Sequence, residues 1–277
     1  WCKEIENEYP NFNIVGEAWY PRGTASAWWQ KDSKMNESNS NLKTVMDFDL
    51  TFTCQKAFGE VCSSNEGSEA GLFKIYEVIA QDFLFPNPNN VLTFLDNHDL
   101  GRFMQKGETD LRRYKQAIAF LLTTRGIPQI YYGTEILMTG TKAEGDGVIR
   151  TDFPGGWAGD PKNAFTPEGR TDLQNEAWNY MKKILNWRKH CDAVKEGKLI
   201  HYTPDGTGCY VYARVKDNKT VLVLMNGTDK NQTLDMNRFQ EVVKDYKSGK
   251  DIITDTTVAI DTPVQIPARG VYILELS

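Results

Sequence analysis

Side chains able to do acid–base chemistry follow two short apolar segments of the chain. Glu17 comes directly after Asn13–Gly16, and the string Asn97–Asp99 (Asn-His-Asp) comes shortly after Val91–Leu95. Carboxylates and imidazoles are the groups that most often move protons in active sites. Either string alone is more typical of a solvated carboxylate or of a turn with a hydrogen-bonded histidine. The two strings therefore indicate an active site only if the fold brings them together.

The elements that would position these strings alternate between strand-like and helix-like patterns. Short apolar runs over Asn13–Gly16, Thr44–Phe48, Val91–Leu95 and Ile127–Tyr132 are typical of strands covered on both faces. Strands that alternate with helices predict a parallel sheet joined by right-handed crossovers. Because the carboxyl ends of parallel barrel strands share one face, we expect the two polar strings to meet there.

Three helices are predicted from apolar residues spaced three and four apart. The first stripe covers Leu72–Phe83, and the second covers Leu111–Leu122, with Thr109 as its N-cap and Gly126 as its stop. A third helix covers Trp178–Arg188.

Near Cys191 the pattern changes to strands separated by turn signals. We therefore predict two domains, a catalytic part over residues 1–191 and an antiparallel β-sandwich over residues 192–277. The predicted strands of the second part are 199–203, 209–215, 221–226, 257–260 and 271–276.

Three strings, taken in order, resemble the α-amylase family of glycoside hydrolases. Residues 16–19 read Gly-Glu-Ala-Trp, residues 97–99 read Asn-His-Asp, and residues 126–135 read Gly-Ile-Pro-Gln-Ile-Tyr-Tyr-Gly-Thr-Glu. Met46–Phe48 and Gly147–Trp157 are similar to neopullulanase- and cyclomaltodextrinase-like members. The resemblance covers residues 1–190, and an amylase-type β domain would cover the rest.

The resemblance implies an α/β fold, the C-terminal half of a (β/α)8 TIM barrel followed by an all-β antiparallel sandwich. It implies retaining hydrolysis of α-1,4-glucans such as starch oligosaccharides, cyclodextrins and pullulan. Glu17 would be the catalytic acid/base, and Asp99 would stabilise the transition state. The substrate-binding residues that it implies are His98, Asn97, Trp19, Asp152, Phe153 and Trp157.

The nucleophile of the family is an aspartate in a Gly-x-Arg-x-Asp setting, one strand before the acid/base. This chain begins only a few residues before Glu17. We expect the nucleophile and the first half of the barrel to lie outside it, and the isolated chain to be inactive. Arg150–Asp152 has the Arg-x-Asp spacing but follows the last predicted strand, so we interpret it as part of a substrate loop. A half barrel has open sheet edges, which predicts that the chain alone dimerises, exchanges elements or aggregates.

Other residues near the strand ends have structural interpretations. Asp47 and Asp96 are expected to make structural hydrogen bonds, and Glu135 to hold a loop in place. The adjacent tryptophans Trp28–Trp29 lie in a predicted loop. They are either a sugar platform or packed under a lid.

The composition of the chain excludes several classes of binding partner. The net charge of −5 argues against nucleic acid and anionic membranes, and no apolar run is long enough to span a bilayer. The five cysteines form no Cys-x-x-Cys pair, so no zinc site is expected. The implied chemistry requires no cofactor. Family members often hold structural calcium, but this segment contains no Asp-x-Asp-x-Asp-Gly loop to support it.

The expected partners are an α-glucan oligosaccharide and the upstream half of the barrel, with a homo-oligomer as a further expectation. A secreted or periplasmic location is favoured over a cytoplasmic one. Two other classes of protein compete with an enzyme, a non-catalytic amylase-like subunit and a glucan-binding protein. Because this chain keeps both Glu17 and Asp99, we favour the enzyme.

Overall fold

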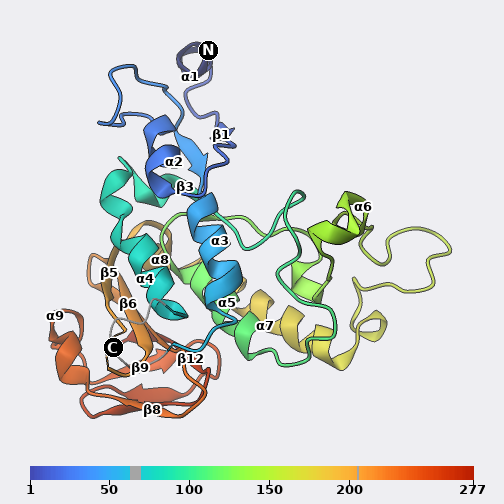
Figure 1. Cartoon of the computed structure of the whole chain (residues 1–277). Helices are drawn as coiled ribbons and strands as arrows, with labels where there is room; N and C mark the ends of the chain where they lie inside the picture. Colours follow the sequence, from blue (N-terminus) through green and yellow to red (C-terminus); the bar gives the residue numbers. More distant parts are fainter. Residues whose placement is uncertain (63–69, 205) are drawn as a thin grey trace.

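The computed structural model describes residues 1–62, 70–204 and 206–277, and its N-terminal part is built on a four-stranded parallel sheet. The strands lie in the order β1 (Val15–Gly16), β2 (Thr44–Met46), β3 (Val91–Thr93) and β4 (Ile127–Pro128) (Figure 1). Each strand is parallel to its neighbour. The predicted parallel strands therefore form, although each is shorter than its apolar segment.

Helices separate the strands along the chain, as crossover connections require. Ala27 packs with Val45 and Val91 in one buried cluster, whereas Met46 packs with Phe48 in another. Consecutive strand residues point to opposite faces, so both faces of the sheet are covered here. The helices are α1 (Cys2–Glu8), α2 (Gly23–Trp29), α3 (Phe48–Ala57), α4 (Leu72–Ala80), α5 (Arg112–Thr123), α6 (Asp146–Ile149), α7 (Asp172–Arg188), α8 (Asp192–Glu196) and α9 (Gln240–Val243). The 3-10 turns are Asp82–Leu84, Pro88–Asn90, Thr134–Ile136, Lys142–Glu144, Pro167–Gly169 and Met236–Phe239.

Helices α2 and α3 were not predicted from the sequence. The tryptophans Trp28–Trp29, expected in a loop, end helix α2. The strand expected over Thr44–Phe48 ends early because Asp47 is the N-cap of α3. Its side chain accepts a hydrogen bond from the backbone N–H of Leu50 at 3.1 Å.

Two details of the predicted helices are wrong. Helix α4 ends at Ala80 and a 3-10 turn follows, so Phe83 leaves the buried stripe and is 82% exposed. Helix α5 begins at Arg112 and is not capped by Thr109. Instead, the Asp110 carboxylate accepts a hydrogen bond from the Arg112 N–H at 3.0 Å.

The C-terminal part is antiparallel β structure, as predicted. Six strands lie in the order β10-β9-β12-β7-β6-β5, and two more form the pair β11-β8. Val211 and Leu224 of the larger sheet pack with Leu234 and Ile266 of the pair in one buried cluster, which makes a sandwich. The strands are β5 (Lys198–Tyr202), β6 (Cys209–Lys216), β7 (Lys219–Asn226), β8 (Gln232–Leu234), β9 (Ser248–Asp251), β10 (Thr257–Ala259), β11 (Val264–Ile266) and β12 (Val271–Leu276). Strands β8, β9 and β11 were not predicted.

Helix α5 joins the helical part to the antiparallel part. The ring of Phe120 lies 6.5 Å from the ring of Tyr210 and 6.0 Å from that of Tyr212. The Thr123 hydroxyl makes a 2.5 Å hydrogen bond with the Tyr212 hydroxyl. These side chains are buried. The face of β6 that carries Tyr210 and Tyr212 therefore belongs to the same core as the helices.

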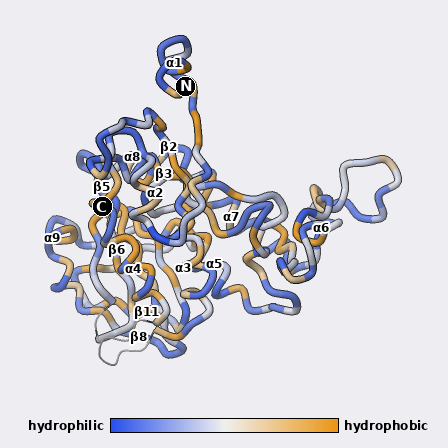
Figure 2. Tube along the Cα trace, turned by 45° about the horizontal axis from the view of Figure 1, so that its top comes forward, coloured by the Kyte–Doolittle hydropathy of each residue, from blue (hydrophilic) through white to orange (hydrophobic). Residues whose placement is uncertain are grey.

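Hydropathy follows this arrangement. Figure 2 shows orange, hydrophobic segments within the body of the molecule and mostly white and blue colours on the long segment beyond α6. Among the residues that the structure describes, no helix combines the length and the apolarity needed to cross a membrane.

The outer strands of the parallel sheet have no further strand beside them in the described part of the chain. Val15 in β1 is 45% exposed, and Ile127 in β4 is 42% exposed. Such edges present unpaired backbone groups that can bind another strand.

Candidate active site

Three titratable side chains gather beyond the carboxyl ends of β1 and β3. One nitrogen or oxygen atom from each of Glu17, His98 and Asp99 lies within 4.8 Å of the others. Glu17 directly follows β1, and the other two follow β3 by a few residues. Because both strands are parallel to β2, their carboxyl ends lie at the same edge of the sheet. The two polar strings of the sequence therefore meet, with Glu17 and His98 exposed.

A buried asparagine shapes the turn that presents His98 and Asp99. The side-chain oxygen of Asn97 accepts hydrogen bonds from the N–H groups of Asp99 and Leu100, both at 2.9 Å. Asn97 is only 1% exposed. The side-chain oxygen of Asn97 therefore holds the turn, and its substrate-binding role stays a prediction.

An arginine missed as a site residue contacts this turn. Arg150 Nη2 lies 2.6 Å from Asp99 Oδ1, and its Nε donates to the backbone oxygen of His98 at 2.7 Å. On the other side of the carboxylate, His98 Nε2 lies 3.1 Å from Asp99 Oδ2. In the Arg-x-Asp string, the arginine makes the contact with the turn.

Two acidic residues below the turn have structural partners. Asp96 is 2% exposed and accepts hydrogen bonds from the Phe103 N–H at 2.9 Å and the Thr134 hydroxyl at 3.0 Å. Its burial raises its pKa to about 6, although these hydrogen bonds act in the opposite direction. Glu135 accepts from the Gly133 N–H at 2.6 Å. Both residues hold loops, as the sequence indicated.

Aromatic side chains lie beside Glu17. Trp19 stacks on Phe48 with ring centroids 4.5 Å apart, and it remains 41% exposed. A cavity of about 480 Å³ is lined by Glu17, Trp19, Tyr20 and Trp29, among others. Trp29 comes from the unpredicted helix α2, so the sequence did not place it near the carboxylate. Exposed aromatic faces of this kind are suited to packing against sugar rings.

The remaining predicted substrate residues lie on the long segment after α6. In the described part of the chain, Asp152, Phe153 and Trp157 make no hydrogen bond, ion pair or ring contact with Glu17 or Asp99. Phe153 packs against Phe165 with ring centroids 4.5 Å apart, while Trp157 is 80% exposed. Figure 1 shows this segment projecting from the body before it returns to α7.

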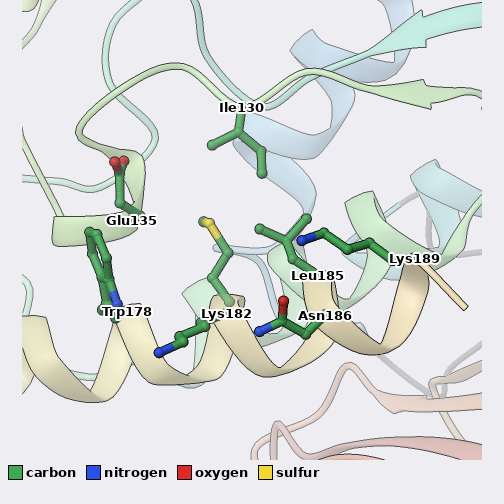
Figure 3. A pocket seen from close by; sticks show the side chains of 8 residues that line it. Ile130, Glu135, Trp178, Lys182, Leu185, Asn186 and Lys189 are labelled. Atoms are coloured by element: carbon green, nitrogen blue, oxygen red, sulfur yellow. The ribbon is translucent and has the colours of Figure 1, made fainter.

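A second cavity lies away from the carboxylates, along α7. Its volume is about 470 Å³, and Figure 3 shows Ile130 facing Leu185 across it. Met181 and Trp178 add to the apolar lining, and Lys182 stands at the rim. Ile130 lies just after β4, an outer strand of the sheet, so one wall of this groove lies near the carboxyl end of that strand.

The cluster of Glu17, His98 and Asp99 has two carboxylates and an imidazole. Among the described residues, these three side chains lie close enough to one another to hold a metal ion. Calcium prefers ligand sets made of oxygen alone, so this donor set does not fit a structural calcium. The arrangement fits acid–base chemistry on a bound molecule better, because Glu17 is open to solvent and has no described hydrogen-bond partner on its carboxylate.

Comparison with known proteins supports the family resemblance that the sequence motifs and the fold indicate. Residues 199–275 match the cyclo-malto-dextrinase C-terminal domain family. The cyclomaltodextrin glucanotransferase of Thermoanaerobacterium thermosulfurigenes is 30% identical over 207 residues, which is 74% of this chain and 26% of that protein. The α-amylase of Niallia circulans is 28% identical over 272 residues, or 95% of this chain and 45% of that protein.

A solved structure of an Anoxybacillus α-amylase superposes on the whole chain with a TM-score of 0.76 at 23% identity, and the chain covers 54% of it. The fold consists of a parallel strand–helix part followed by an antiparallel sandwich. The acidic site lies at the carboxyl ends of the parallel strands. The chain belongs to the α-amylase family. It corresponds to the C-terminal part of that family's cyclomaltodextrin-related members, and it spans between about a quarter and a half of the relatives it matches.

Proposed function

We propose that this chain is part of a retaining glycoside hydrolase that acts on α-1,4-glucans. Glu17 is the acid/base, Asp99 stabilises the oxocarbenium-like transition state, and His98 donates a hydrogen bond to the same sugar. The observation that carries the proposal is the meeting of these three side chains within 4.8 Å at one edge of the sheet. The relatives' names, α-amylase and cyclomaltodextrin glucanotransferase, support the substrate class.

The nucleophile, in this proposal, comes from a segment outside the chain. The parallel sheet is half of a (β/α)8 barrel, and its two exposed edges, at Val15 and Ile127, pair with strands of the other half. The apolar groove along α7, lined by Met181 and Leu185, receives a helix of that half. The boundary between barrel and sandwich lies near Cys191.

Asp152, Phe153 and Trp157 contact more distant glucose units in this proposal, from the segment that projects beyond α6. Trp19 and Trp29 line a cavity together with Glu17, and in this proposal their rings pack against a glucose unit there. A second candidate reaction is transfer of the glycosyl group to another sugar. It is favoured because the aromatic cavity could bind an acceptor sugar and because two relatives are named cyclomaltodextrin glucanotransferase. Both reactions use the same carboxylates.

The test is the substitution Glu17→Gln in the full-length protein that contains this chain. Turnover of maltoheptaose, cyclodextrin and pullulan should fall by about 100-fold or more, since an amide cannot deliver the proton. Thermal stability should stay unchanged because the Glu17 side chain is exposed. The matched control is Glu77→Gln on α4, whose side chain is also exposed and which lies outside the site.

Each outcome decides one part of the proposal. Unchanged turnover in Glu17→Gln would refute the acid/base role. Glucan binding without turnover in the wild type would favour the non-catalytic or glucan-binding alternative. Maltose release by the purified chain alone would refute the external nucleophile. Longer oligosaccharides formed from maltoheptaose would identify transfer in place of hydrolysis.

A further inference from the structure

We infer that Arg150 is a positioning residue that orients Asp99 for the reaction, an inference that rests on the proposed function. The guanidinium spans two consecutive residues of the turn. Nη2 contacts Asp99 Oδ1 at 2.6 Å, and Nε donates to the His98 backbone oxygen at 2.7 Å. One planar fork therefore fixes both the backbone of the turn and the carboxylate that it carries.

The two oxygens of Asp99 have different neighbours. Oδ1 is held by Arg150, and Oδ2 faces His98 Nε2 at 3.1 Å. With one oxygen held by the loop, rotation of the carboxylate is restricted, and Oδ2 stays on the side of the imidazole. An ammonium group lacks the planar pair of N–H donors, so a lysine at this position cannot make both contacts in the same geometry.

Arg150 is itself held in place. It is the C-cap of the short helix α6, and its Nη2 lies 3.1 Å from Asp146 Oδ2, four residues earlier. Asp146 also pairs with Lys142. A chain of alternating charges thus runs from the loop to the turn, and it couples the base of the projecting segment to Asp99.

The contact matters for geometry more than for stability. The side chains of Arg150 and Asp99 are 41% and 28% exposed, and ion pairs this open to water add little to folding. Misplacement of a reacting or stabilising group by about 1 Å, in contrast, can lower the rate by about 100-fold. Loss of Arg150 should therefore be seen in kcat before it is seen in melting temperature.

The experiment compares Arg150→Ala and Arg150→Lys with the wild type in the full-length protein, using maltoheptaose as substrate. In Arg150→Ala, kcat should fall about tenfold or more while KM changes by less than about twofold, and Arg150→Lys should restore only part of kcat. Arg112→Ala is the matched control, because Arg112 forms an exposed ion pair with Asp110 outside the site. It should leave both constants unchanged.

A crystal structure of Arg150→Ala gives a second readout that does not need activity. Asp99 should take another side-chain conformation, and an unmoved carboxylate would overturn the inference even if the wild type acts on no glucan. Wild-type kcat and KM in Arg150→Ala, with Glu17→Gln inactive, would overturn the inference and leave the proposed function standing. A raised KM with unchanged kcat would make Arg150 a substrate contact and would equally overturn the positioning role.

Discussion

The buried carboxylate of Asp96 makes the stability of the protein depend on pH in a way that one substitution removes. Asp96 is 2% exposed, and its hydrogen-bond donors are the Phe103 N–H and the Thr134 hydroxyl. Asparagine has the same shape and keeps both contacts, since its oxygen accepts from Phe103 and its amide donates to the rotatable hydroxyl. Asp96→Asn therefore removes the titration and leaves the packing intact.

The magnitude follows from the pKa. Burial raises the pKa of Asp96 from an ordinary value of 3.8 to about 6. At roughly 1.4 kcal/mol per pKa unit, the ionised form costs about 3 kcal/mol once both states are deprotonated. The folded state holds this proton more tightly than the unfolded state, so stability from this group is full below about pH 4 and is lost as the pH rises through 6.

The assay is denaturant unfolding of the full-length wild type and of Asp96→Asn at a series of pH values. Other titrating groups cancel in the difference between the two proteins. Between pH 4 and pH 7.5, the unfolding free energy of Asp96→Asn relative to that of the wild type should rise by about 2 kcal/mol. A difference that stays constant within about 0.5 kcal/mol over this range would refute the assignment of a raised pKa to Asp96.

Two further predictions concern the ion pairs and the sheet edges. Arg125→Met should lower the unfolding free energy of the full-length protein by about 3–5 kcal/mol, because it leaves the carboxylates of Asp47 and Asp82 without their buried cation. A loss below about 1 kcal/mol in denaturant unfolding would contradict this account. The purified chain should sediment as dimers or larger species, because the outer strands at Val15 and Ile127 each have one edge without a partner strand in the described part of the chain. A cooperative, monodisperse monomer would count against the half-barrel proposal.

The positions of the parallel strands could be predicted because their signals are local. Each of the runs near Val45 and Val91 is apolar and is followed by polar residues, and this is enough to predict a buried strand. Helix α3 escaped prediction because Asp47 reads equally well as the end of a strand. Only its capping contact with Leu50 shows that the chain turns into a helix there. Short strands such as β8 escaped for a related reason, since three residues carry too little pattern.

The sequence by itself determined the parallel strand–helix order, the antiparallel tail, the family and the two candidate carboxylates Glu17 and Asp99. The tertiary structure decided which side chains share a surface. It buried Asn97, placed Trp29 beside Glu17 and brought Arg150 onto Asp99 across about fifty residues of chain. The physical reason is that strand and helix patterns arise from neighbours in the sequence, whereas burial and charge pairing depend on contacts between segments that only the packed fold brings together.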